Sequence, residues 1–69
     1  MHITNDDILD SIERLTRVTD GIPPTYREIA TDLDVQVSLI HRRLHQLRDD
    51  KRVTFRDQLS RTVRIAQSH

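Results

Sequence analysis

The side chains best suited to chemistry lie at helical spacing near the middle of the chain. Ser38, Arg42 and His45 recur at intervals of four and three residues, so they share one face of a helix, with His41 beside them. An arginine guanidinium matches the O6 and N7 acceptors that guanine shows in the major groove of DNA, and Gln36, just before this set, suits adenine. The pattern predicts that these five side chains read base edges, with Arg42 as the strongest candidate.

Two apolar side chains interrupt this polar segment. Val37 flanks the apolar side of the helix and is expected to be buried, whereas Leu39 lies well off the apolar arc. An exposed leucine can contact the methyl group of thymine, or it can belong to a surface that binds another protein. Leu39 is therefore both a base-reading candidate and the support for a protein-binding alternative.

Candidate contacts to the DNA backbone precede this helix in the sequence. Thr25, Tyr26 and Arg27 lie at the start of another predicted helix, where free backbone N–H groups and the helix dipole attract a phosphate. Each of the first two has a structural alternative. Thr25 is better explained as the helix cap, and Tyr26 is equally suited to packing on the scaffold.

Further backbone candidates follow the helix. Arg56 and Arg61 flank the tip of a predicted hairpin, from which side chains reach the DNA backbone or the minor groove. Lys51 and Arg52 lie at the base of the same hairpin. These two can contact phosphate, or they can pair with the aspartates at positions 49 and 50.

The same residues offer weaker support for a metal site. His41 and His45 are four residues apart, and Asp49 follows one turn later, but no fourth ligand is nearby. The chain has no cysteine, no Ser-His-Asp set, no phosphate-binding loop and no dinucleotide fingerprint. At 69 residues it is also too small to enclose a deep pocket. We expect neither a metal nor a cofactor, and no enzymatic activity.

The charges are balanced in number but not in position. The chain holds 11 Lys+Arg and 11 Asp+Glu. Residues 41–69 carry eight of the basic side chains and three of the acidic ones, and residues 1–40 carry the reverse. Unless this segregation is chance, one side of the fold attracts phosphate and the other side faces away from it or meets a partner.

The periodicity of apolar residues predicts the elements that position these side chains. It indicates one domain over residues 1–69, mainly α, with helices at 5–19, 25–33 and 36–49 and a hairpin over 52–66. Val18 ends the apolar stripe of the first helix. The expected core consists of Ile8, Ile12, Leu15, Ile29, Ala30, Leu33, Val35, Ile40, Leu44, Leu47, Val53, Phe55, Val63 and Ile65.

Caps and turns mark the ends of the predicted helices. Thr4 or Asn5 can cap the first helix, and Asp20-Gly21 ends it because glycine adopts the left-handed conformation. Thr25 through Glu28 forms a capping box at the start of the second helix. Residues 34–36 leave room only for a tight turn, so the second and third helices form a helix-turn-helix unit, with the basic hairpin as a wing.

These segments resemble a known family. Residues 22–30, IPPTYREIA, are similar to the start of the helix-turn-helix in the N-terminal domain of the LexA repressor. Residues 33–44, LDVQVSLIHRRL, are similar to the turn and recognition helix of bacterial winged-helix regulators. The chain departs from the family at Asp34, where glycine is usual and aspartate tolerates the left-handed conformation, and in the wing, which has no glycine. It also has no counterpart of the self-cleavage machinery.

The pattern and the resemblance together predict a bare winged helix-turn-helix module that regulates transcription, as a repressor that occludes a promoter. Such modules are common on phages and other mobile elements. A module this small contacts few base pairs, so we expect a homodimer on palindromic double-stranded DNA, in the cytoplasm and away from membranes. The alternative is a winged-helix module that binds another protein, as an antirepressor or a complex subunit, and does not read DNA.

Overall fold

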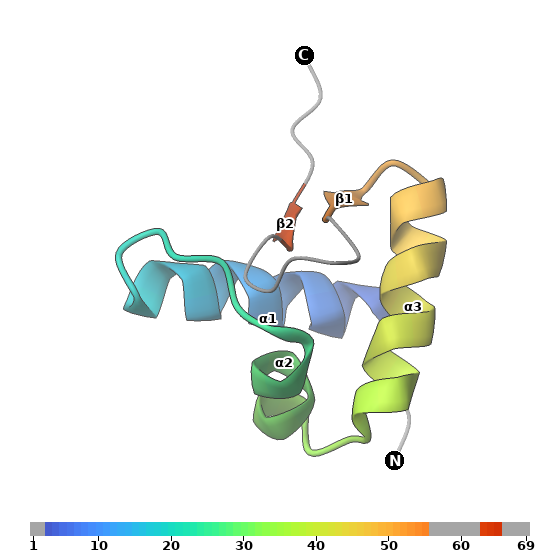
Figure 1. The fold of residues 1–69 in the computed structure, drawn as a ribbon, viewed down its shortest axis with the longest axis horizontal. Helices are drawn as coiled ribbons and strands as arrows, with labels where there is room; N and C mark the ends of the chain where they lie inside the picture. The colour runs from blue at the N-terminus through green and yellow to red at the C-terminus, as the bar shows by residue number, and fades with distance from the viewer. Residues whose placement is uncertain (1–2, 56–62, 66–69) are drawn as a thin grey trace.

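The computed structural model describes residues 3–55 and 63–65, which form three helices and a short antiparallel hairpin (Figure 1). The elements are α1 (Asn5–Val18), α2 (Tyr26–Leu33), α3 (Val37–Asp49), β1 (Val53–Thr54) and β2 (Arg64–Ile65). The predicted fold class, a mainly helical winged helix-turn-helix, is confirmed. The predicted tip of the wing, with Arg56 and Arg61, lies outside the described residues. None of the helices in the described ranges could span a membrane.

Capping boxes begin the first two helices. Thr4 caps α1: its hydroxyl accepts from the backbone N–H of Asp7 at 3.1 Å, and its own N–H donates to the Asp7 carboxylate at 2.8 Å. Thr25 and Glu28 repeat this exchange at the start of α2, at 3.1 and 2.9 Å. Thr4 is therefore the cap, and Asn5 is the first residue of the helix.

All three helices end on a residue in the left-handed conformation that is not glycine: Asp20 (φ 57°), Asp34 (φ 57°) and Lys51 (φ 62°). In each case the N–H of the next residue returns to the last turn, through Gly21 to Thr16 (2.8 Å), Val35 to Ala30 (3.0 Å) and Arg52 to Leu47 (2.9 Å). These are the hydrogen bonds of a Schellman cap. Asp34 closes its turn as predicted. The prediction for Gly21 is corrected, because Asp20 takes the capping position and Gly21 (φ 101°) follows it.

The core lies where the three helices and the hairpin meet. The buried apolar side chains are Ile3, Ile8, Ile12, Ile29, Ala30, Ile40, Leu44, Leu47, Val53, Phe55 and Val63. In the hairpin, Val53 pairs with Ile65 and Thr54 with Arg64. Its apolar residues alternate with the exposed Thr54 and Arg64, as the period of two predicts. The hairpin therefore closes the core over α1 and α3.

Two apolar residues lie elsewhere than predicted. Val37, expected to be buried, is 40% exposed at the first position of α3. Val18, at the end of the apolar stripe and outside the expected core, is 75% exposed. Leu39, expected to be exposed, is half-buried and packs against the core. One turn further along α3, Arg43 ties this helix to the N-terminal segment: it donates to the Asn5 side chain (3.0 Å) and the carbonyl of the buried Ile3 (3.3 Å).

A polar cluster ties α1 to α2. The guanidinium of Arg14 donates two hydrogen bonds to the Asp32 carboxylate, at 2.7 and 2.8 Å, and the buried Ser11 hydroxyl donates a third at 2.7 Å. The hydrogen bond from Arg14 lowers the pKa of Asp32, and the same contact raises the pKa of Arg14. This cluster holds the first helix of the helix-turn-helix unit at a defined position on the scaffold.

Candidate nucleic-acid interface

The turn before α3 presents the first candidate residue. Asp34 reverses the chain after α2, and Gln36 becomes the N-cap residue of α3. The Gln36 side chain makes no cap hydrogen bond and is exposed. Its amide is therefore available to a ligand at the helix start.

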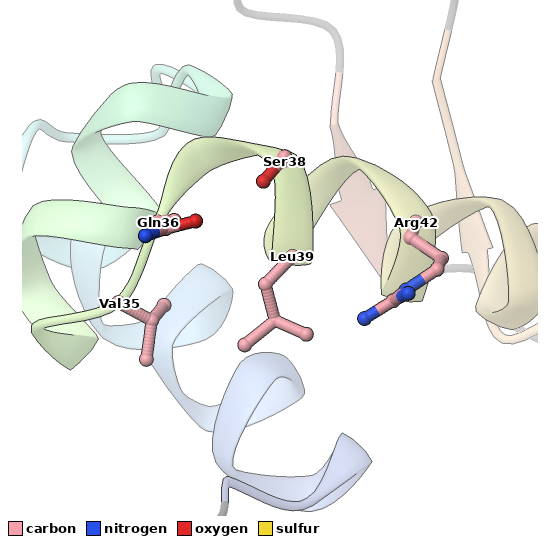
Figure 2. A pocket seen from close by; sticks show the side chains of 5 residues that line it. All are labelled: Val35, Gln36, Ser38, Leu39 and Arg42. Atoms are coloured by element: carbon pink, nitrogen blue, oxygen red, sulfur yellow. The ribbon is translucent and has the colours of Figure 1, made fainter.

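An exposed polar surface follows on the first turns of α3. Gln36, Ser38, His41 and Arg42 are all exposed, and we call these four residues the reading face. Figure 2 shows Gln36, Ser38 and Arg42 around an open groove, together with Val35 and Leu39. The groove combines a charged end at Arg42 with an apolar floor.

Arg42 differs from most arginines in the described ranges in having no partner. Five arginines contact other side chains or a carbonyl: Arg14 (Asp32), Arg17 (Glu13), Arg43 (Asn5, Ile3), Arg48 (His45, Phe55) and Arg52 (Asp6). Across the described ranges, the basic side chains without such a contact are Arg27, Arg42, Lys51 and Arg64. Of these, only Arg42 lies on α3.

Aromatic and imidazole rings line one flank of α3, and His41 belongs both to this row and to the reading face. Tyr26, His41, His45 and Phe55 form this aromatic row, with centroid distances of 5.4 Å (Tyr26–His41), 4.4 Å (His41–His45), 5.2 Å (His45–Phe55) and 5.7 Å (Tyr26–Phe55). Three of the four pairs meet edge-to-face, the arrangement that aromatic quadrupoles favour. The row joins the start of α2, the middle of α3 and the end of β1.

This row changes the interpretation of two predicted site residues. His45 is half-buried, since Phe55 covers it, and its ring contacts protein on three sides. Tyr26 packs against His41 and Phe55, so the scaffold alternative describes its position. Helical periodicity placed His45 on the polar side correctly, but it carried no information that Phe55, the residue after β1, would contact it.

The start of α2 supplies one open cation. The Thr25 hydroxyl accepts from the backbone of Glu28, so it acts as the predicted cap. Arg27, one residue into the helix, is exposed. Its guanidinium is available beside a helix N-terminus, where an anion is favoured.

The base of the wing supplies another. Lys51 is exposed, and only its backbone takes part in the cap of α3. Arg52 forms its ion pair with Asp6 of α1, at 3.3 Å, and with neither of the aspartates that precede it. Of the two cations predicted here, Lys51 is the open one.

His41 and His45 do not form part of a metal-ligand cluster within the described residues. Their Nε2 atoms are 3.1 Å apart, but no cluster of three or more His, Asp or Glu side chains suited to a metal occurs in the part of the chain that the structure describes. Asp49 therefore does not join them.

No protein-family model matches the chain, and no curated protein matches it.

Proposed function

We propose that this protein is a sequence-specific double-stranded DNA-binding regulator that inserts the first turns of α3 into the major groove. The observation that carries the proposal is the unpartnered, exposed guanidinium of Arg42, which shares a groove with Gln36 and Ser38 on the first turns of the second helix of a helix-turn-helix unit. In such units the N-terminal residues of the second helix contact base edges. Arg42 supplies the bidentate contact to guanine, and Gln36 the contact to adenine.

Phosphate contacts support this docking. Arg27 lies at the start of α2 and Lys51 follows the end of α3, and both are exposed cations without a side-chain partner, so each is a candidate for a phosphate contact. Several acidic side chains are engaged within the fold: Asp7 and Glu28 in caps, Asp6 with Arg52, and Asp32 with Arg14. The exposed Asp49 and Asp50 lie at the far end of α3, away from the reading face.

The small size of the module favours binding as a dimer. A module of 69 residues reads only a few base pairs, so a homodimer on a palindrome, with half-sites about 10 bp or a multiple of that apart, supplies the specificity. A bound dimer represses by occluding the promoter beneath it. This proposal places the protein in the cytoplasm.

The second candidate is a module that binds a protein. Its support is the groove itself, since Val35 and Leu39 give it an apolar floor. Leu39 is only partly exposed and packs against the core, which weakens one of the observations that favoured this alternative.

Selection from a random duplex pool at near-physiological salt separates the two candidates. Recovery of a palindromic motif, with an affinity that falls steeply as salt rises, supports the DNA-binding function, because phosphate contacts release counterions. Recovery of no motif by the folded protein, with salt-insensitive capture of one purified protein partner, overturns it in favour of the second candidate.

A further inference from the structure

The two histidines of the aromatic row form a directional hydrogen bond. Nε2 of His41 and Nε2 of His45 are 3.1 Å apart, so one nitrogen carries a proton and donates a hydrogen bond, and the other nitrogen accepts that bond. In a neutral imidazole, one ring nitrogen donates and the other accepts. The direction of this bond therefore decides which nitrogen of each ring remains a donor.

Arg48 sets that direction. Its Nη2 lies 3.1 Å from Nδ1 of His45. A guanidinium donates and never accepts, so Nδ1 of His45 must be the acceptor. The proton of the neutral His45 ring is then on Nε2, and this N–H donates the hydrogen bond to Nε2 of His41.

The chain of hydrogen bonds ends on the reading face. His41 accepts at Nε2, so its proton is on Nδ1. His41 is exposed, and within residues 3–55 and 63–65 its Nδ1–H has no acceptor. His41 thus presents an Nδ1–H donor to a ligand. Arg48, which does not lie on the reading face, fixes the tautomer in which Nδ1 of His41 is that donor.

Packing holds the participating rings and the guanidinium in place. The guanidinium carbon of Arg48 lies 4.4 Å from the centroid of Phe55, and the rings of Phe55 and His45 meet in a T-shaped arrangement with an interplanar angle of 90°. Tyr26 contacts His41 from α2 at 5.4 Å. Phe55 is itself only 8% exposed, so the arrangement is anchored in the core.

We propose that His41 is a specificity-determining residue that acts as an obligate donor in the major groove, with Arg48 as the residue that selects its tautomer. This inference rests on the proposed DNA-binding function. An Nδ1–H donor is satisfied by guanine O6 or N7, adenine N7 or thymine O4, and it is opposed by the N4 amino group of cytosine. His41 therefore excludes cytosine at the base that it contacts.

The tautomers are tested without DNA. Long-range ¹H–¹⁵N spectra of the full chain, taken at the high-pH plateau where the imidazoles are neutral, report which nitrogen carries each proton. The expected result is Nδ1–H for His41 and Nε2–H for His45. In Arg48→Met, which keeps a long side chain over Phe55 but removes the donor, the signals of His41 should shift toward a mixture of tautomers. Nε2–H on His41 in the wild-type protein overturns the proposal, even if the variant does not fold.

Base preference is tested by selection of duplexes with wild type, His41→Phe and Arg48→Met. Wild type should exclude cytosine at one position of its motif, and both variants should relax that exclusion by on the order of ten-fold while the other positions persist. If both variants still exclude cytosine at that position, the proposed role of His41 is overturned, but the DNA-binding function is not. A wild-type protein that is folded and recovers no motif overturns the DNA-binding function as well, while the spectra report the tautomers independently.

Discussion

Arg14 and Asp32 form a bidentate ion pair that joins α1 to α2, with nitrogen-to-oxygen distances of 2.7 and 2.8 Å. The buried Ser11 hydroxyl donates to the same carboxylate from within the interface, at 2.7 Å. The Asp32 side chain is only 20% exposed, unlike those of the other ion-paired acidic residues in the described ranges. Asp32 is therefore the acidic residue whose protonation state most directly affects how the helix-turn-helix unit is held.

The pair predicts an acid-sensitive contribution to stability. Because the pKa of Asp32 is lowered in the folded protein, the contribution is present above the unfolded value of about 4 and is lost as the pH falls through the folded value. Asp32→Asn should lower the free energy of unfolding at neutral pH, and its difference from wild type should shrink below about pH 4. Urea titrations at several pH values measure this. Asp10→Asn is the control, since its carboxylate is 75% exposed and 3.8 Å from Arg14. An equal loss in both variants would contradict the assignment.

The left-handed cap residues predict stabilising substitutions. Lys51 has φ 62°, which costs a residue with a Cβ atom about 1 kcal/mol and costs glycine almost nothing. Lys51→Gly should therefore raise the free energy of unfolding by up to about 1 kcal/mol. Asp34→Gly should gain less, because aspartate tolerates this conformation better.

A matched control for these caps lies one position earlier. Asp50 has φ −81°, so Asp50→Gly should bring no gain and should destabilise the protein through the flexibility of the unfolded chain. Chemical denaturation of the three variants decides the order. A gain at position 50 that equals the gain at position 51 would show that the left-handed conformation is not the cause.

Phe55 predicts a coupled loss of packing at the wing base. It contacts Tyr26, His45 and Arg48 and is 8% exposed. Phe55→Leu should lower the free energy of unfolding by about 1 to 2 kcal/mol. It should also shift the imidazole NMR signals of His45 toward the chemical shifts of an exposed ring. Thermal denaturation and NMR spectra check both parts. Unchanged His45 signals in the variant would contradict the contact.

Arg27 predicts a sequence-independent effect on affinity. If it contacts phosphate, Arg27→Ala should weaken binding to all duplexes by a similar factor and should reduce the slope of log affinity against log salt by about 1. Arg17→Ala is the control, because Arg17 is occupied by Glu13 on α1 at 2.8 Å. Fluorescence anisotropy across a salt series gives both slopes. A slope that falls equally in the control would remove Arg27 from the interface.

Local signals in the sequence predicted much of the scaffold. The spacing of Thr25 and Glu28 predicts the cap of α2, and Asp34 predicts the turn, because each depends on chemistry within a few residues. The alternation of Val53 and Phe55 with polar residues likewise predicts which side of the strand is buried. Such features need no knowledge of distant segments.

Long-range contacts account for what the sequence did not show. A helical wheel places Val37 near the apolar arc and Leu39 off it, but it cannot show how the other elements pack around α3, which leave Val37 exposed and Leu39 partly buried against the core. His45 and Phe55 are ten residues apart, and their contact depends on how the wing folds back. Within the proposed function, this contact makes His45 a positioning residue for His41 instead of a base reader.

The proposed base reading by α3 depends most directly on Arg42. The decisive measurement is the affinity of Arg42→Ala and Arg64→Ala, each compared with wild type on the selected duplex and on a scrambled one. Arg64 is also exposed and unpartnered, but it lies on β2 beside α1, away from the reading face. Arg42→Ala should lose about 1 to 3 kcal/mol on the selected duplex and far less on the scrambled one, while Arg64→Ala should bind as wild type does. Equal effects of the two variants, or equal losses on both duplexes, would contradict base reading by α3.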